Sequence, residues 1–172
     1  MELKPQDVVV ALKLCVLKIP GTYAAFGKSL GISASEAHAA VRRLTEAGLA
    51  DSDSKSINRV KLRNFIIHGV PYAFPAKTQE MTRGMPTAWA APVMVGRISQ
   101  SDQSTPVWAD PDGKTKGVAV KPLYASVVMA ATADHALYDL LALVDAIRIG
   151  QARDRNIAEE ELTLRLKEYG RN

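Results

Sequence analysis

The fold of this chain is decided by residues 26–49, which read FGKSLGISASEAHAAVRRLTEAGL. The stretch predicts a helix, a tight turn and a second helix. Gly31 can adopt the positive φ with which many helices end, and Ser33 can cap the helix that follows. Glu36 stands three residues after Ser33, which is the spacing of a capping box. These signals place the second helix from about residue 33 to residue 47.

The second helix has one apolar and one polar face. Ala37, Val41 and Leu44 recur at spacings of four and three residues and form one apolar stripe. Gly48 then ends the helix. The opposite face carries Ser35, Glu36, His38, Ala39, Arg42 and Arg43. A short helix with a polar and basic outer face fits the major groove of DNA.

Three motifs in this stretch follow a known pattern. They are Phe26-Gly27 before the turn, Leu30-Gly31-Ile32 within it, and Leu44, Ala47, Gly48 and Leu49 at its end. With them the stretch resembles the helix-turn-helix of winged-helix transcriptional regulators, especially those of the MarR type. The resemblance implies a winged helix that binds double-stranded DNA. A winged helix used only for protein contacts is the alternative, because folds host many functions.

The expected docking gives the polar residues of this region separate roles. Arg42 and Arg43 are expected to bind phosphates or guanine edges. Glu36 and His38 are expected to read bases, Glu36 by accepting a hydrogen bond from cytosine. The serines at the helix N-terminus are expected to hold a phosphate. The full set of expected DNA contacts is Lys28, Ser33, Ser35, Glu36, His38, Arg42, Arg43, Lys55 and Arg59.

Residues 51–58, DSDSKSIN, are polar and rich in turn formers, and they predict the wing. The segment shows little apolar alternation, so the wing is expected to be short. Lys55 is its natural phosphate contact, although a solvated loop is an equal alternative. Residues 58–70 then predict a helix that ends at His68-Gly69. Its basic face, with Arg59, either touches the DNA backbone or is solvated.

Basic residues are concentrated directly after the expected recognition helix. The chain of 172 residues has a net charge of +4 and a pI of about 9.2. Residues 55–100 carry seven Lys or Arg and one Asp or Glu, whereas residues 1–54 carry six of each kind. The excess therefore falls where a wing would lie. This distribution is compatible with a nucleic-acid partner.

The single cysteine, Cys15, excludes an internal disulfide and favours a cytoplasmic location. It lies in an apolar helical pattern and is expected to be a buried core thiol; a redox sensor is the alternative. The N-terminus lacks the features of a signal peptide. No apolar run approaches the ~20 residues of a membrane span, so no membrane partner is expected.

Further helices are expected on both sides of the helix-turn-helix. Pro5 suits the first turn of a helix that Pro20-Gly21 stops, and Thr22 can cap the next one. Near the C-terminus, Asp134 can cap a helix, and residues 151–169 predict a charged amphipathic helix. The family resemblance implies that such C-terminal helices form a homodimer.

The middle of the chain is less regular. Four prolines in residues 71–93 exclude a long helix. This Pro/aromatic linker could wrap a partner subunit, line a ligand pocket or cover its own core; the last two are preferred, and a nucleic-acid arm with Lys77 and Arg83 is a further alternative. Pro111-Asp112-Gly113 predicts a turn, and the apolar runs beside it predict a small β-hairpin after a polar loop at 99–105.

Motifs of catalysis are not found in the sequence. It has no Walker-type glycine loop, dinucleotide fingerprint or Gly-x-Ser-x-Gly elbow. His38, His68 and His135 are scattered and have no metal-ligand spacing. An enzyme is therefore the least favoured class, and no catalytic residue, metal or cofactor is expected.

Together these features predict a mainly α (α+β) protein. Residues 1–70 are expected to form a winged-helix DNA-binding domain, and residues 71–172 a dimerisation or regulatory domain with a β-hairpin and helices. The expected function is that of a dimeric bacterial repressor, whose operator would be an inverted repeat. The alternative is an antitoxin-like or defence-operon module that binds an operon-encoded protein. The sequence does not specify the operator, the regulated genes or an effector.

Overall fold

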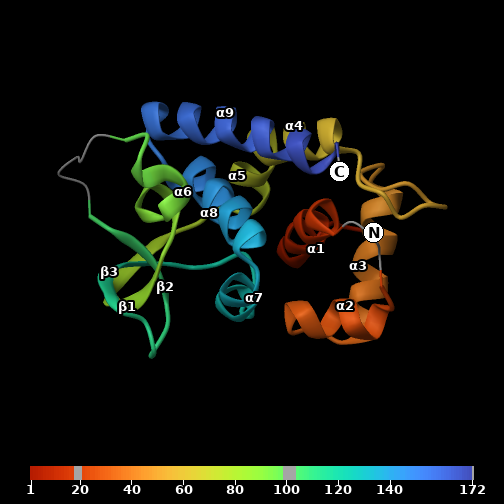
Figure 1. Ribbon diagram of the computed structural model, residues 1–172, viewed down its shortest axis with the longest axis horizontal. Helices are drawn as coiled ribbons and strands as arrows, with labels where there is room; N and C mark the ends of the chain where they lie inside the picture. The colour runs from red at the N-terminus through yellow and green to blue at the C-terminus, as the bar shows by residue number, and fades with distance from the viewer. Residues whose placement is uncertain (18–20, 99–103, 172) are drawn as a thin grey trace.

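The computed structural model describes residues 1–17, 21–98 and 104–171 (Figure 1). Within these ranges the chain is mainly helical with one small sheet, which confirms the predicted mainly α (α+β) class. The elements are α1 (Pro5–Val16), α2 (Tyr23–Leu30), α3 (Ala34–Glu46), α4 (Arg59–His68), α5 (Val70–Ala73), β1 (Thr78–Pro86), η1 (Ala88–Ala90), α6 (Pro92–Val95), β2 (Pro106–Ala109), β3 (Thr115–Val120), α7 (Val127–Ala133), α8 (His135–Ile149) and α9 (Ala152–Tyr169). Pro20, expected to stop the first helix, and residues 99–103 of the expected polar loop lie outside the described ranges.

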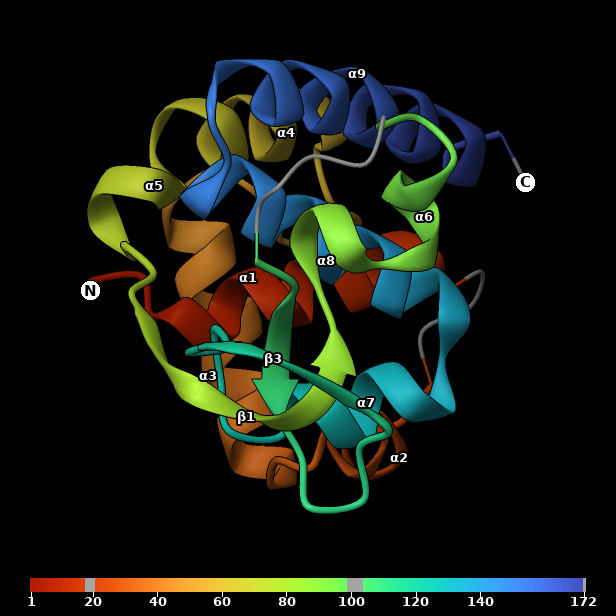
Figure 2. The same ribbon diagram turned by 90° about the vertical axis from the view of Figure 1, so that its left-hand side faces the viewer.

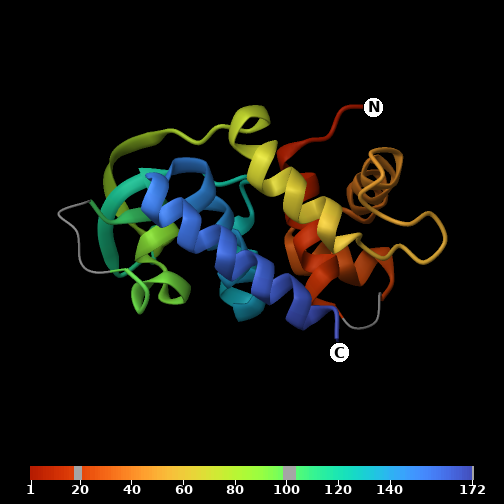
Figure 3. The same cartoon turned by 90° about the horizontal axis from the view of Figure 1, so that it is seen from above.

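The helix-turn-helix and the sheet occupy opposite ends of the longest axis of the molecule (Figure 1). Helices α2 and α3 lie at one end, β1, β2 and β3 at the other, and α1 and α8 between them. Helices α4 and α9 run side by side along one flank, as the view from above shows (Figure 3). The sheet and α3 therefore present separate surfaces.

One hydrophobic core runs through the described part of the chain. It contains Leu12 of α1, Leu44 of α3 and Leu62 of α4 together with Leu141 of α8 and Leu162 of α9, each at most 1% exposed. The sequence places a domain boundary near residue 70, whereas the core crosses that position without a break. The helix-turn-helix is thus supported directly by the C-terminal helices.

Cys15 lies in this core and is 1% exposed. Burial raises the pKa of its thiol to about 12, against an opposing effect from the positive charge of Arg59. The thiol is therefore protonated at neutral pH, whereas the reactive form of cysteine is the thiolate. The prediction of a buried core thiol is confirmed.

The predicted β-hairpin is wrong. Strands β2 and β3 follow one another in the chain, but they pair parallel to each other, and each pairs antiparallel with β1. The result is a small closed sheet in which every strand contacts the other two. The turn at Pro111-Asp112-Gly113 was predicted correctly, but β1 lies inside the stretch that was expected to be irregular.

Glycines make this close sheet possible. A Cβ on Gly84 would lie 1.9 Å from the carbonyl oxygen of Trp108, and a Cβ on Gly117 would lie 2.1 Å from that of Thr105. A Cβ on Gly113 would lie 2.5 Å from the Cα of Gly84. Real side chains do not tolerate such distances. The three backbones can therefore approach one another only where these positions lack a side chain.

A buried polar cluster attaches the sheet to α8. The carboxylate of Asp145 accepts hydrogen bonds from Thr87 Oγ1 at 2.8 Å and from Trp108 Nε1 at 2.7 Å. It also pairs with Arg148 at 2.9 Å. The nearby Ala88, Ala91 and Met94 are buried in the core. Of the interpretations of residues 71–93, coverage of the chain's own core is therefore the one that this packing supports.

Candidate nucleic-acid interface

The local structure of the helix-turn-helix follows from its caps. Thr22 Oγ1 accepts a hydrogen bond from the backbone N–H of Ala25, and α2 ends at Gly31 with φ of 69°. Ser33 Oγ accepts from the backbone N–H of Glu36 at 3.1 Å, so α3 begins at Ala34. The predicted helix, turn and helix are confirmed, and the turn is held by α7, because Ser126 Oγ donates to the carbonyl of Leu30.

The outer face of α3 is narrower than the sequence predicts. The exposed residues of this face are Ser33, Ser35, His38 and Arg42, which we call the reading face. The inner face is buried, and it consists of Ala37, Ala40, Val41, Arg43 and Leu44. Six of the expected DNA contacts lie on α3 or at its N-cap. Four of these six are exposed, and the other two, Glu36 and Arg43, are not.

Arg43 was expected on the exposed outer face of α3 as a DNA contact, and this prediction of its exposure is wrong. It is only 5% exposed. Its Nε and one terminal nitrogen donate to the two carboxylate oxygens of Asp7 on α1, at 2.8 and 2.7 Å. The hydrogen bond with Asp7 raises the pKa of Arg43, although burial opposes the shift. The guanidinium is thus charged and already neutralised inside the protein, and it holds α3 against α1.

Glu36 is also engaged inside the protein instead of facing a base. One of its carboxylate oxygens accepts hydrogen bonds from Arg43 and from Gln6 Nε2, each at 2.8 Å. The bond from Arg43 is the main reason why the pKa of Glu36 lies below its ordinary value. The capping box is accordingly half formed: Ser33 bonds the backbone of Glu36, but the Glu36 side chain turns to Arg43.

Arg59 was expected to touch the DNA backbone, but its side chain points elsewhere. It is half-buried, and one terminal nitrogen donates to the carbonyls of Cys15 on α1 and Tyr169 on α9, at 3.2 and 3.3 Å. Arg59 therefore links three helices of the core. Both this contact and that of Arg43 join residues far apart in the sequence, so helical periodicity could not reveal them.

Residues 51–58, where a short wing was expected, form a loop that we call the wing. It is closed by one antiparallel bridge, between Ala50 and Ile57. The carboxylate of Asp51 accepts hydrogen bonds from the backbone N–H groups of Asp53 and Ser54 and so folds the loop on itself. At its tip Lys55 adopts a φ of 55° and remains exposed. The wing thus presents one lysine.

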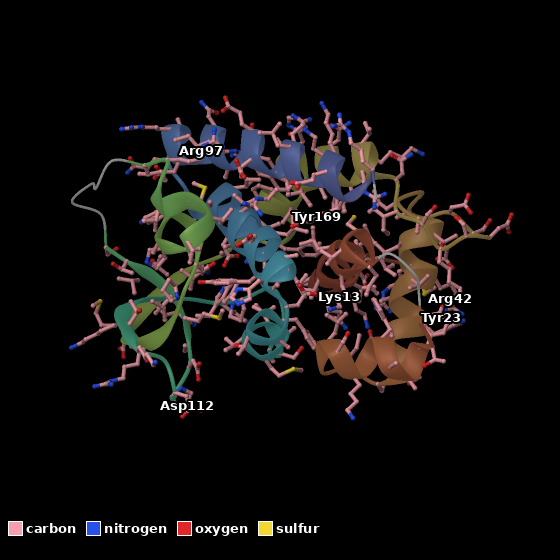
Figure 4. All side chains as sticks on the ribbon, in the orientation of Figure 1. Lys13, Tyr23, Arg42, Arg97, Asp112 and Tyr169 are labelled. Atoms are coloured by element: carbon pink, nitrogen blue, oxygen red, sulfur yellow. The ribbon has the colours of Figure 1, made fainter. Side chains whose placement is uncertain are left out.

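Tyr23, which sequence reasoning missed, joins the wing to the reading face. Lys55 Nζ lies 4.5 Å from the centroid of the Tyr23 ring, a cation–π distance. The same ring meets the imidazole of His38 edge to face, with centroids 5.1 Å apart. Tyr23 and Arg42 lie near each other at this end of the molecule (Figure 4). An aromatic residue at the start of α2 gives no sequence signal for this role.

A hollow lies between α3 and the wing. It has a volume of about 240 Å³, and its lining comprises Tyr23, His38, Val41, Arg42, Thr45, Ser52 and Lys55. Arg42 lies 3.8 Å from Glu46 in an exposed pair, and such pairs contribute little energy. Its guanidinium can therefore exchange that partner for an anion. Lys28 is exposed on α2, outside the hollow.

Metal-binding clusters and membrane-spanning helices are not found in the described ranges. These ranges contain no group of three His, Cys, Asp or Glu residues that could hold a metal ion. No helix there is long and apolar enough to span a bilayer. Comparison of the chain with protein-family models, curated proteins and solved structures finds no match.

Proposed function

We propose that the chain binds double-stranded DNA, with the reading face of α3 in the major groove and the wing against the backbone. The observation that carries the proposal is the convergence of His38 and Arg42 on α3 with Lys55 on the wing around one exposed hollow. Two of these side chains lie on α3, which has the size of a groove-binding helix, and the third lies on the loop beside it. A cytoplasmic transcriptional regulator is the class of protein that this arrangement suits best.

Each exposed residue has a role in this docking. Ser33 and Ser35 stand at the N-terminus of α3, where backbone N–H groups favour a phosphate. The guanidinium of Arg42 can donate hydrogen bonds to a guanine edge or to a phosphate, and His38 can read a base edge. Lys28 and Lys55 would bind phosphates on either side of the groove. The Arg43–Asp7 pair keeps α3 at a fixed angle to α1.

The proposed DNA-binding form is a homodimer. A homodimer would place two α3 helices on successive major grooves, so the operator would be an inverted repeat with half-sites about one helical turn apart. Binding at a promoter would then act by occlusion, as in a bacterial repressor. The dimer is part of the proposal and is tested separately, by sedimentation of the free protein and of its DNA complex.

The first prediction concerns Arg42. Duplexes selected from a random pool by the wild-type protein serve as the probe, and affinity is measured by fluorescence anisotropy at two salt concentrations. Replacing Arg42 with alanine should weaken binding by about 1–3 kcal/mol if the guanidinium reads a guanine. The melting temperature should not change, because the side chain is exposed. Lys167→Ala, an exposed change on α9, is the matched control.

The same titration can contradict the proposal. If Arg42→Ala and Lys55→Ala both bind the selected duplexes as tightly as the wild type, the docking through α3 is wrong. If selected and random duplexes lose affinity equally with added salt, the surface only attracts the DNA backbone. The second candidate function is that of an antitoxin-like or defence-operon module that binds a protein. The exposed basic pair Arg83 and Lys116 on the sheet favours this candidate.

A further inference from the structure

Two basic side chains are held directly opposite each other on the sheet. Arg83 of β1 and Lys116 of β3 are partners in the antiparallel register, and both are exposed. Directly opposed residues on one face lie close together, and like charges there destabilise a sheet. The Arg83–Lys116 pair therefore opposes the stability of a sheet whose backbones are otherwise closely packed. Local features that oppose stability in this way are typical of functional surfaces.

The next pair on the same side of the sheet is apolar. Met81 of β1 lies opposite Val118 of β3, and because side chains alternate along a strand, this pair shares a side with Arg83 and Lys116. Met81 is 57% exposed, and Val118 is half-buried. We call these four residues the sheet face. Strands β1 and β3 are turned toward the viewer in Figure 2.

In the described ranges, the basic side chains on and beside the sheet form no ion pair with a carboxylate. The exposed basic residues on and beside the sheet are Lys77, Arg83, Lys114, Lys116 and Lys121. Within the part of the chain that the structure describes, none of them lies within 4 Å of a carboxylate oxygen. The acidic residues nearby, Glu80, Asp110 and Asp112, are fewer. An anionic partner would remove the repulsion.

The three strands beneath the sheet face are closely packed and attached to α8. Gly84, Gly113 and Gly117 allow the strands to close on one another, and the buried Asp145 cluster fixes the sheet to α8. Each strand pairs with the other two over part of its length. The opposed charges and the apolar pair of the sheet face are the groups that a partner's side chains would meet.

We propose that the sheet face docks an acidic segment of a partner protein. Carboxylates of the segment would pair with Arg83 and Lys116, and an apolar side chain would cover Met81 and Val118. A nucleic-acid backbone offers nothing to cover the apolar pair, and the sheet face has no aromatic ring on which a base could stack. This inference goes beyond DNA binding and does not depend on it.

The test uses labelled synthetic peptides and the full-length chain. One peptide alternates leucines with pairs of glutamates, a second of equal length contains glutamates only, and an oligonucleotide of matched charge is the third probe. Fluorescence anisotropy measures binding at low salt and at physiological salt. We expect the peptide with leucines to bind more tightly than the peptide with glutamates only. The oligonucleotide can also bind the reading face of α3, and its binding should not change in Lys116→Glu.

The decisive variant is Lys116→Glu, because it should change binding and stability in opposite directions. It places a carboxylate opposite Arg83, so the melting temperature should rise by about 1–2 °C. Affinity for the peptide with leucines should fall at least about tenfold, since one favourable charge becomes repulsive. Lys28→Glu, an equal charge change at the far end of the molecule, should leave peptide binding unchanged.

Several results would overturn the inference. One is wild-type affinity of Lys116→Glu for the peptide with leucines, and another is an equal loss in Lys28→Glu. A third is tighter binding of the oligonucleotide that Lys116→Glu abolishes, which would make the sheet face a nucleic-acid site. If Lys116→Glu folds poorly, the neutral double variant Arg83→Gln/Lys116→Gln replaces it, with the same expected loss. Arg42→Ala should not affect the peptide, so this test is independent of DNA binding.

Discussion

Replacing Arg43 with alanine should lower the free energy of unfolding by about 3–5 kcal/mol. The change removes both hydrogen bonds to Asp7, whose side chain is 1% exposed, and leaves that carboxylate buried without a counter-charge. It also frees Glu36 from its main partner. Urea denaturation followed by circular dichroism measures the loss. DNA affinity should fall as well, because α3 loses its attachment to α1.

Two controls separate this effect from a lost DNA contact. Arg42→Ala, next to it in sequence but exposed, should change the free energy of unfolding by less than about 0.5 kcal/mol. The double variant Asp7→Leu/Arg43→Met should recover much of the stability, because no isolated charge remains buried. If Arg43→Ala unfolds like the wild type and yet loses DNA affinity, Arg43 reaches DNA and its assignment to the core is wrong.

Replacing Asp145 with alanine should also cost about 3–5 kcal/mol of unfolding free energy. The substitution removes the carboxylate that pairs with the guanidinium of Arg148, whose side chain is only 4% exposed. The guanidinium is then buried without a counter-charge. The substitution also leaves the buried donors of Thr87 and Trp108 unpaired, which adds their desolvation penalties. Urea denaturation followed by tryptophan fluorescence measures both the loss and the altered environment of Trp108.

The matched control is Asp139→Ala on the same helix. Asp139 pairs with Arg165 at 2.8 Å, but both side chains are about a quarter exposed. The loss should therefore stay within about 1 kcal/mol. Asp145→Asn keeps an acceptor and should fall between the two. Equal losses for Asp139→Ala and Asp145→Ala would mean that the buried cluster does not hold the sheet to α8.

The helix-turn-helix could be predicted because its signals are local. The caps at Thr22 and Ser33 and the positive φ at Gly31 act within a few residues of where they occur. The apolar stripe of α3 reports its buried face directly, since helical periodicity fixes which residues share a side. The exposure of His38 and Arg42 follows from the same pattern.

The supporting contacts of the site could not be predicted, because they join distant residues. Arg43 borders the apolar stripe, and only the packing of α1 supplies Asp7, 36 residues away, as its partner. Arg59 likewise meets Tyr169 across 110 residues. A basic residue in a basic region looks the same in sequence whether it faces solvent or a buried carboxylate.

The sheet shows a different limit. Pro111, Asp112 and Gly113 correctly marked a turn, but a turn does not determine which strands pair across it. The sequence did not predict the partner strand β1, because the prolines near its ends and Gly84 within it are unfavourable in strands. The close approach of Gly84 to Trp108 explains that glycine afterwards, but it requires the register to be known.

The core that crosses residue 70 couples the stability of the two ends of the molecule. Because α1 and α4 pack against α8 and α9, the chain should unfold as one cooperative unit. A fragment ending at residue 70 would expose apolar faces and could not report on DNA binding alone. A partner that binds the folded sheet would also increase the population of folded molecules by mass action, and the proposed DNA binding by α3 would increase with it. The two surfaces are thus thermodynamically linked even if neither changes the shape of the other.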